Sequence, residues 1–403
     1  MFLERNLGYP FSFELDVHRS ASKSYVTPIF DRIISESARW RRVTLRIGLA
    51  DISPLYHVKG KLEHLESLEF FLENNTVDDV VHTIPETFTD LFMSAPHLTR
   101  VHMLPLSTWN LNWPLVTVLR LGLARPEQVA QLPLILSQAM QVETLSVYIY
   151  FQTGTNLLSQ GLITLPNLTA LETDCFSLLQ IMITPSLKEL RVYFGWVDES
   201  EPHPTVAGVM KSFISRSQCR IQTLSLEDLG ATSAIAILSH TPDIRVLYMG
   251  MIFGMIDIFG WLNEMHRVKS PQLTHLQSII MYTSSLPQGR NALDEIFEFI
   301  AWRRIRIEGT GSIVEKLQKF GFGGCWDFDE ADEDADVGQI QELLRKQCGL
   351  HDVQFSVNRD RFEIEGSHDR SSDPYVYSSF FSDDPYESSD EWSGEVTYWT
   401  IPV

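Results

Sequence analysis

A short phrase recurs along the chain and restricts its fold more than any other feature of the sequence. The phrase is a proline, any residue, an aliphatic residue, any two residues and a second aliphatic residue. It occurs at 96–101, 114–119, 166–171, 185–190, 242–247 and 271–276, and proline-free copies occur at Leu65/Leu68, Val142/Leu145 and Ile221/Leu224. Proline lacks an N–H group and favours an extended residue before it, so it suits the entrance of a strand rather than its middle. The sequence therefore predicts a series of short, similar strands.

The spacing of this phrase predicts a leucine-rich-repeat solenoid of the α/β class. The second aliphatic residue recurs on average every 26 residues between Leu68 and Leu276, with individual steps of 18 to 34 residues. Leucine-rich repeats are about 20–29 residues long, and because one unit cannot bury its apolar face alone, the units stack. We expect an irregular horseshoe of about ten parallel strands from Val43 to about Ile307, with helical or loop returns. Helical spacing favours return helices at 126–140, 207–217, 232–240 and 257–268.

The composition changes after this array, which we place at residues 1–310. Residues 311–366 are predicted to form a small C-terminal α+β cap, with helices at 312–320 and 337–347, an acidic loop at 327–336, and a hairpin of 352–357 with 361–365. Residues 367–403 are rich in serine, aspartate and aromatic residues and are predicted to be a disordered acidic tail. Residues 327–403 carry 20 acidic and 5 basic residues, so most of the net charge of −20 belongs to this last part.

The remaining general features favour a chain of the cytoplasm or nucleus that binds neither membranes nor nucleic acid. The start of the sequence is not a secretory signal, and the four cysteines form no C-x-x-C pair. The apolar stretch 246–262 contains Asp257, so we expect a buried strand, a loop and a helix there. The Trp-Arg-Arg phrases at 40–42 and 302–304 could contact nucleic acid. The favoured interpretation is that each tryptophan packs under a strand while the arginines face water.

The search for chemistry predicts no enzyme, no cofactor and no metal site. The sequence has no metal-ligand spacing of histidines, no nucleophile elbow, no phosphate-binding loop and no dinucleotide fingerprint. The acidic run at 327–336 lacks the central glycine and closing glutamate of a calcium loop.

A surface remains as the candidate site. Residues that alternate with the core aliphatics should line the exposed, concave face of the parallel sheet. Tyrosine with scattered charge is typical of a protein-recognition surface, although strand propensity alone also favours tyrosine. The predicted protein-binding residues are Glu69, Phe71, Arg100, His102, Arg120, Ser146, Tyr148, Glu172, Arg191, Tyr193, Ser225, Glu227, Tyr248, His275 and Gln277.

Several phrases, in order, resemble the leucine-rich-repeat F-box-like proteins that are abundant in mushroom-forming fungi. The segments 2–6 and 9–13 are similar to that family's leucine-x-arginine-serine and proline-leucine segment, and 37–40 resembles its serine-x-arginine-tryptophan phrase. The segments 95–98, 112–119 and 184–190 look like its repeat phrases, and 213–219 like its phenylalanine-x-x-arginine-serine-x-cysteine. The resemblance covers roughly residues 2–310. It implies the substrate-binding part of a ubiquitin-ligase adaptor.

The resemblance implies a Skp-type adaptor and a cullin as partners only if an F-box precedes Met1, since the sequence contains no segment that resembles one. The leading hypothesis is a non-enzymatic scaffold that binds an unidentified protein on its sheet. The alternative is a regulatory protein that acts through its acidic, aromatic tail and has no ligase role. The tail is separately predicted to be a phosphorylation-tuned anionic segment that competes with partners for the arginine clusters at Arg39/Arg41/Arg42 and Arg303/Arg304/Arg306.

Overall fold

The computed structural model describes residues 8–16, 23–48, 52–73, 88–104, 109–124, 126–149, 161–194, 206–252, 254–268, 270, 272–282, 290–303, 314–323, 333–350 and 353–358. All of them belong to the first of two compact units, Met1–Arg361. The expected tail at 367–403, the acidic residues 327–332, and Arg304 and Arg306 lie outside the described residues.

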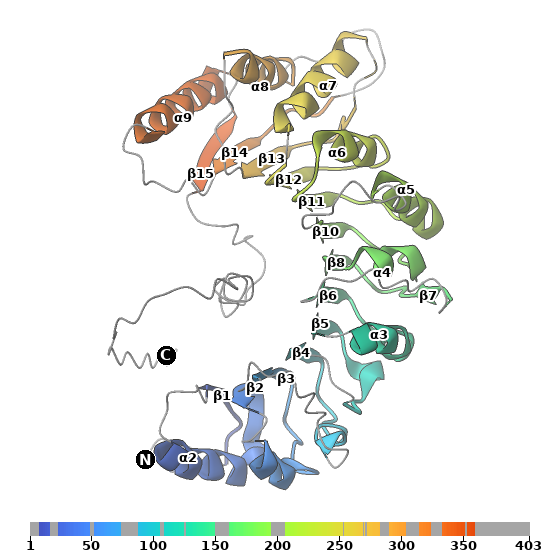
Figure 1. Ribbon diagram of the computed structural model, residues 1–403, viewed down its shortest axis with the longest axis vertical. Helices are drawn as coiled ribbons and strands as arrows, with labels where there is room; N and C mark the ends of the chain where they lie inside the picture. The colour runs from blue at the N-terminus through green and yellow to red at the C-terminus, as the bar shows by residue number, and fades with distance from the viewer. Residues whose placement is uncertain are drawn as a thin grey trace, which may run out of the picture. The chain divides into compact units, whose positions relative to one another are not determined.

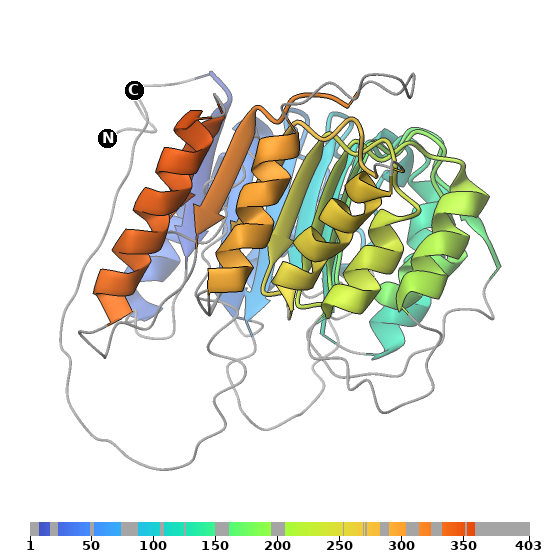
Figure 2. The ribbon, with the colours of Figure 1, turned by 90° about the horizontal axis from the view of Figure 1, so that it is seen from above.

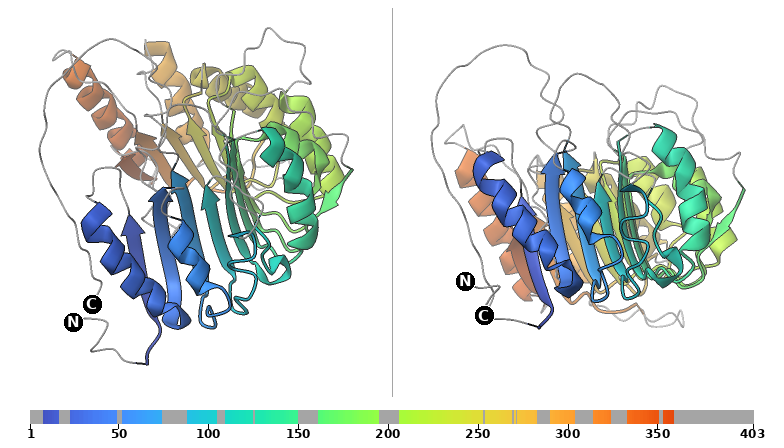
Figure 3. Two further views of the ribbon diagram at one scale, coloured as in Figure 1. Left: turned by 60° about the horizontal axis from the view of Figure 1, so that its bottom comes forward. Right: turned by 90° about the horizontal axis from the view of Figure 1, so that it is seen from below.

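The described part of this unit is a mixed α/β structure built on one large parallel sheet. Thirteen strands pair in the order β1-β2-β3-β4-β5-β6-β8-β10-β11-β12-β13-β14-β15, and every pairing is parallel. Figure 3 shows the N-terminal strands running side by side in one direction. The sheet is not closed, because β1 and β15 each have a single neighbour in it. The strands are β1 Phe11–Asp16, β2 Trp40–Gly48, β3 Ser67–Glu73, β4 Arg100–Leu104, β5 Val118–Leu123, β6 Thr144–Ile149, β8 Ala170–Thr173, β10 Glu189–Tyr193, β11 Thr223–Glu227, β12 Val246–Gly250, β13 Ser278–Tyr282, β14 Lys319–Gly323 and β15 Gln354–Asn358; β7 Ile163–Thr164 and β9 Met182–Ile183 pair apart from it.

The return segments cover one face of the sheet with helices. Figure 1 shows the labelled helices on the same side of the row of strands, and Figure 2 shows α6 to α9 packed side by side. The helices are α2 Lys23–Ser35, α3 Pro126–Gln138, α4 Phe176–Ile181, α5 Val206–Ser217, α6 Ala231–Leu238, α7 Met255–Arg267, α8 Arg290–Trp302 and α9 Glu333–Leu350, with 3-10 turns η1 Ser37–Arg39, η3 Ser53–Val58 and η5 Trp113–Leu115. The return helices predicted at 126–140, 207–217, 232–240 and 257–268 are confirmed by α3, α5, α6 and α7.

The recurring aliphatic residues form the core between the sheet and the helices. From Leu68 to Leu247, the predicted second aliphatic residue of each phrase pairs in register with its equivalent in the neighbouring strand. Each of these side chains is at most 2% exposed: Leu68, Val101, Leu119, Leu145, Leu171, Leu190, Leu224 and Leu247. Burying one such aliphatic side chain contributes about 1.5–3 kcal/mol, so this row is a large part of what holds the strands together.

The prediction for the ninth unit is wrong by three residues. Leu247 pairs in register with Ile279, so Leu276 takes the place of Ile244 and not of Leu247. Aliphatic residues follow one another at intervals of three through Leu273, Leu276 and Ile279, and the proline before Leu273 marks the earlier pair. Leu273 itself has a positive φ of 52°, so the backbone turns there before the strand begins.

The sheet extends beyond the predicted array at both ends. β1 precedes the strand expected to open the array, and β14 and β15 continue the same parallel sheet beyond residue 310. The helix predicted over 312–320 is wrong, because Lys319 and Phe320 begin β14 and residues 314–318 have no regular structure. Val314, Leu317 and Phe320 are buried at the same three-residue spacing as the other units, and this spacing also fits a helix.

The predicted C-terminal hairpin is tested only in its first arm. Its first arm is β15, which pairs in parallel with β14, whereas its second arm at 361–365 lies outside the described residues. Alternating residues indicate a strand but not its partner, so the sequence could not distinguish a hairpin from another repeat. The helix expected at 337–347 is confirmed by α9, which already begins at Glu333 within the predicted acidic loop.

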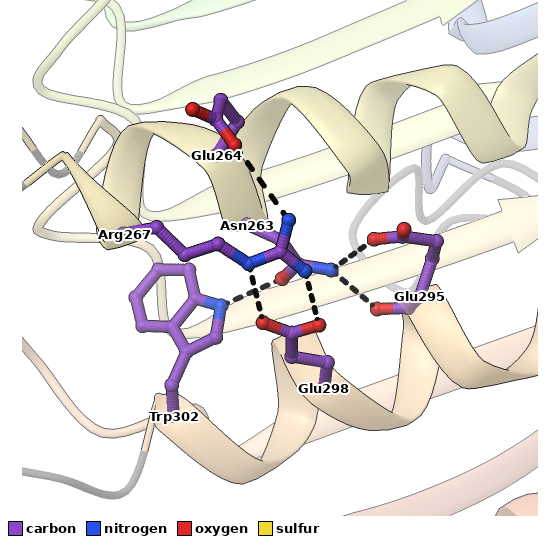
Figure 4. A network of polar contacts seen from close by, with 6 residues as sticks. All are labelled: Asn263, Glu264, Arg267, Glu295, Glu298 and Trp302. Atoms are coloured by element: carbon purple, nitrogen blue, oxygen red, sulfur yellow. Dashed lines mark hydrogen bonds and ion pairs between the residues drawn. The ribbon is translucent and has the colours of Figure 1, made fainter.

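The stretch 246–262 is a strand followed by a helix, β12 and α7, as predicted. Within the described ranges, no helix is long and apolar enough to cross a membrane. Helix α7 packs on α8 through polar side chains that Figure 4 shows in detail. Trp302 Nε1 donates to Asn263 Oδ1 at 2.7 Å, and Asn263 Nδ2 donates to the Glu295 carbonyl oxygen at 2.8 Å. Arg267 Nε donates to Glu298 Oε1 at 3.0 Å on the surface of the same helix pair.

The two Trp-Arg-Arg phrases differ in structure. Trp40 and Trp302 are buried, as predicted, and Arg41 and Arg42 are exposed. The prediction that the arginine after Trp302 faces water is wrong: Arg303 is 1% exposed. Its guanidinium donates to the carbonyl oxygens of Leu273 and Leu276, so it ties α8 to the turn before β13. Arg303 is therefore no part of a basic surface.

Candidate protein-binding face

The face of the sheet opposite the helices carries most of the predicted site residues. Side chains alternate along each strand, so the neighbours of the buried core residues point away from the helices. We call this surface the sheet face. It contains Glu69, Phe71, Arg100, His102, Arg120, Ser146, Tyr148, Glu172, Arg191, Tyr193, Ser225, Glu227 and Tyr248, which all lie on strands β3 to β12.

A continuous row of these residues crosses the middle of the sheet. The consecutive register partners are His102, Arg120, Ser146, Glu172, Arg191, Ser225 and Tyr248. At about 4.8 Å between neighbouring strands, seven strands extend the row over roughly 29 Å. The parallel register therefore brings together residues that are up to 146 positions apart in the chain.

His275 and Gln277 do not belong to the sheet face, which corrects their prediction. Both precede β13, and both contact Glu315: His275 Nδ1 lies 3.0 Å from Glu315 Oε1, and Gln277 Nε2 donates to Glu315 Oε2. The three-residue shift of the ninth unit causes this error. The register partner of Tyr248 is Ile280, which is 9% exposed.

Glu172 is the centre of a hydrogen-bonded cluster on the sheet face. Arg191 Nη1 and the Tyr193 hydroxyl each donate to Glu172 Oε1 at 2.9 Å, and Ser146 Oγ donates to Glu172 Oε2 at 3.3 Å. Burial alone raises the pKa of Glu172, but the Arg191 guanidinium and the hydroxyls of Tyr148 and Tyr193 together lower it below its ordinary value. Glu172 is thus a fixed anion that orients the side chains around it.

Two further carboxyl groups beside this cluster have raised pKa values. Burial raises the pKa of Glu227 to about 7, and Ser225 Oγ donates a long hydrogen bond of 3.4 Å to Glu227 Oε1. Burial likewise raises the pKa of Asp174 to about 7, although its two oxygens accept from the Ile149 amide at 2.8 and 3.0 Å. Sequence reasoning missed Asp174, although its place two residues after Glu172 puts it on the same face by strand alternation.

The N-terminal half of the sheet face stacks planar side chains. The Arg46 guanidinium lies 4.4 Å from the centre of the Phe71 ring, and the Phe71 and His102 ring centres are 4.8 Å apart. Arg46 Nε also lies 3.7 Å from Glu14 Oε1. Burial, with the positive charges of Arg120 and Arg46, lowers the pKa of His102 to about 4, so this imidazole is neutral at pH 7.

The raised pKa of Glu227 predicts a pH-dependent effect of Glu227→Gln. The unfolded glutamate has a pKa of about 4.3, so between about pH 4 and pH 7 the folded state holds a proton that the unfolded state lacks. The stability that this proton gives is present below about pH 4 and is lost as the pH rises through 7. Because glutamine stays neutral, the variant should gain about 1–3 kcal/mol of stability relative to the wild type between about pH 5 and pH 8.

The measurement is urea unfolding of both proteins across that pH range. Asp174 and His102 are present in both, so their titrations cancel in the difference. Glu264→Gln, which replaces an exposed glutamate on α7 by glutamine, is the matched control. A pH-independent difference for Glu227→Gln would show that the carboxyl is already ionised in the folded protein at pH 5.

Neither a metal site nor a similarity to known proteins indicates a function for the sheet face. Among the residues with described positions, no group of three or more histidine, cysteine, aspartate or glutamate side chains is placed to hold a metal ion. No protein-family model matches the chain, and a search of curated proteins finds no match either. The geometry of the sheet face is therefore the basis for assigning a function to this protein.

Proposed function

We propose that this chain is a leucine-rich-repeat solenoid that acts as a non-enzymatic scaffold and binds a protein partner on its sheet face. One observation carries the proposal: charged, polar and aromatic side chains form a continuous row across the sheet face, which no described helix covers. The sequential strand order supports the solenoid, since each described strand pairs with the strands of the neighbouring units.

The extent and composition of the row favour a protein over a small molecule. A row of roughly 29 Å matches the about 800 Å² per partner of a standard protein interface better than a compact ligand cleft. Tyrosine and arginine are the residues that most often dominate binding energy at such interfaces. Tyr148, Tyr193 and Arg191 lie together, with the two tyrosine ring centres 6.3 Å apart. Their hydrogen bonds to Glu172 hold them in place, which lowers the entropic cost of binding.

The resemblance to F-box-like proteins extends the proposal. In that case the captured protein is a substrate for ubiquitin transfer, and the sheet face selects it. The repeat phrases that carry the resemblance lead into β4, β5 and β10, and the last of them covers the end of α5.

The double variant Tyr148→Ala/Tyr193→Ala tests the proposal. Each aromatic truncation at a hot spot costs about 2 kcal/mol or more, so the double variant should retain proteins from a cell extract at least about tenfold less well than the wild type. Tyr193→Phe is the conservative control, because it removes only the hydroxyl that donates to Glu172. Leu134→Ala/Lys211→Ala, on exposed positions of α3 and α5, is the matched control on the helix face.

Proteins retained by the wild type and the helix-face control but lost from the double variant are the predicted result. Equal retention by all four proteins, each with wild-type thermal stability, would show that the sheet face does not bind the partner.

A further inference from the structure

Between β4 and β11 of the sheet face, β4 and β5 carry only basic charged side chains, whereas acidic side chains outnumber basic ones on β8 to β11, and this separation specifies the partner. We propose that the sheet face binds a protein segment that carries an acidic side chain over β4 and β5 and a basic side chain over β8 to β11. This inference rests on the proposed function, since it names the chemistry of the partner on the same surface.

The end formed by β4 and β5 is positive. These two strands contain Arg100 and Arg120 and no acidic residue. Within the described part of the chain, no hydrogen bond or ion pair engages the Arg120 side chain. His102 lies beside Arg120 in the row and is neutral at pH 7, so it adds a hydrogen-bonding ring without adding charge. A guanidinium next to an imidazole fits a carboxylate, which accepts hydrogen bonds from both groups.

The end formed by β8, β10 and β11 is negative. These strands contain Glu172, Glu189 and Glu227, against which Arg191 is the single cation of the three strands. Arg191 is already engaged with Glu172 at 2.9 Å, whereas Glu227 accepts a long hydrogen bond of 3.4 Å from Ser225.

The position of the Glu227 side chain depends on the glycine in the neighbouring strand. It lies over Gly250, where an added Cβ atom would come within 2.8 Å of Glu227 Cγ. The absence of a side chain at Gly250 therefore leaves room for the Glu227 carboxyl above β12. A partner cation would favour the ionised form of this carboxyl over the protonated one.

The distance between the two ends defines the spacing on the partner. Four strand intervals separate Arg120 on β5 from Glu227 on β11, which is about 19 Å at roughly 4.8 Å per interval. An extended chain rises about 3.3 Å per residue, so the acidic and basic residues of the partner should be roughly six residues apart. The order of the charges also fixes the direction in which the segment lies across the strands.

The experiment selects random 12-residue peptides displayed on phage against the full-length chain. We expect enriched peptides to carry an acidic and a basic residue about six positions apart. For synthetic copies of these peptides, Arg120→Glu should weaken binding about tenfold or more, and a lysine in place of the peptide's acidic residue should restore it. Glu227→Gln should weaken binding in the same direction through the basic residue. Arg345→Glu on α9 and Glu264→Lys on α7 are matched controls at exposed helix positions and should change binding less than about twofold.

The outcomes separate this inference from the proposed function. Suppose that the peptides bind the wild type but not Tyr148→Ala/Tyr193→Ala. If these peptides carry no paired charges, or bind Arg120→Glu as well as the wild type, the inference is overturned and the proposed function stands. Peptides that bind the tyrosine double variant as well as the wild type would overturn both, as would a selection that enriches no peptide.

Discussion

Arg303→Ala is expected to lower the free energy of unfolding by about 2–4 kcal/mol, because it removes a charged donor from the buried carbonyl oxygen of Leu276 and one of the two donors to that of Leu273. The Arg303 guanidinium is 1% exposed and donates to the carbonyl oxygens of Leu273 and Leu276. The Arg303 Cζ atom also lies 5.5 Å from the centre of the Trp302 ring. Burial lowers the pKa of Arg303 to about 10, so the side chain remains charged at pH 7 and its hydrogen bonds are charge-assisted.

Chemical denaturation of the wild type and three variants measures this effect. Arg303→Lys keeps the positive charge but not the planar fork, so it should lose part of the stability that the alanine variant loses. Arg267→Ala removes an arginine whose side chain is 48% exposed and should cost far less stability than Arg303→Ala. An Arg303→Ala protein as stable as the wild type would mean that burying this charge costs as much as its hydrogen bonds contribute.

The repeating core was predictable because one physical requirement recurs in every unit. Each strand needs an aliphatic residue on the helix side, and the preceding aliphatic residue three positions earlier closes the turn into the strand. Leu168 and Leu171 show this pair, and both are buried. Prolines at the entrance made the pairs visible in the sequence. The parallel register of β4, β6 and β10 in one sheet follows from this pattern and is confirmed.

The limits of the array were not predictable, because aliphatic spacing of three residues is common to strand entrances and helices. Leu273, Leu276 and Ile279 form an unbroken series, and only the buried Arg303 and the turn at Leu273 determine which of them begins the strand. The same ambiguity led to a helix prediction in place of β14, because the spacing of Leu317 and Phe320 also fits one face of a helix. Long-range contacts, and not the local sequence pattern, determine where β13 and β14 begin.

Strand alternation identified most of the sheet face, but not its electrostatics. The alternation places Glu172 and Glu227 on one face, but it does not show that burial and neighbouring groups shift their pKa values in opposite directions. That difference depends on Arg191, which reaches Glu172 from the neighbouring strand. The cluster exists only because the parallel register aligns β8 with β10.

Site-specific photocrosslinking is expected to give an all-or-none difference between the two faces of the sheet. Tyr248 lies at the centre of β12 on the sheet face, whereas Leu134 on α3 is 63% exposed on the helix face. A partner that covers the row of sheet-face residues must come within bonding distance of a benzophenone side chain in place of Tyr248. The same group in place of Leu134 is out of its reach.

The measurement is the covalent adduct formed on irradiation in living cells by each of these two proteins. Adducts with another protein from position 248 and none from position 134 are the result that a sheet-face scaffold predicts. Adducts from position 134 with none from position 248, in proteins of equal abundance and stability, would contradict the account.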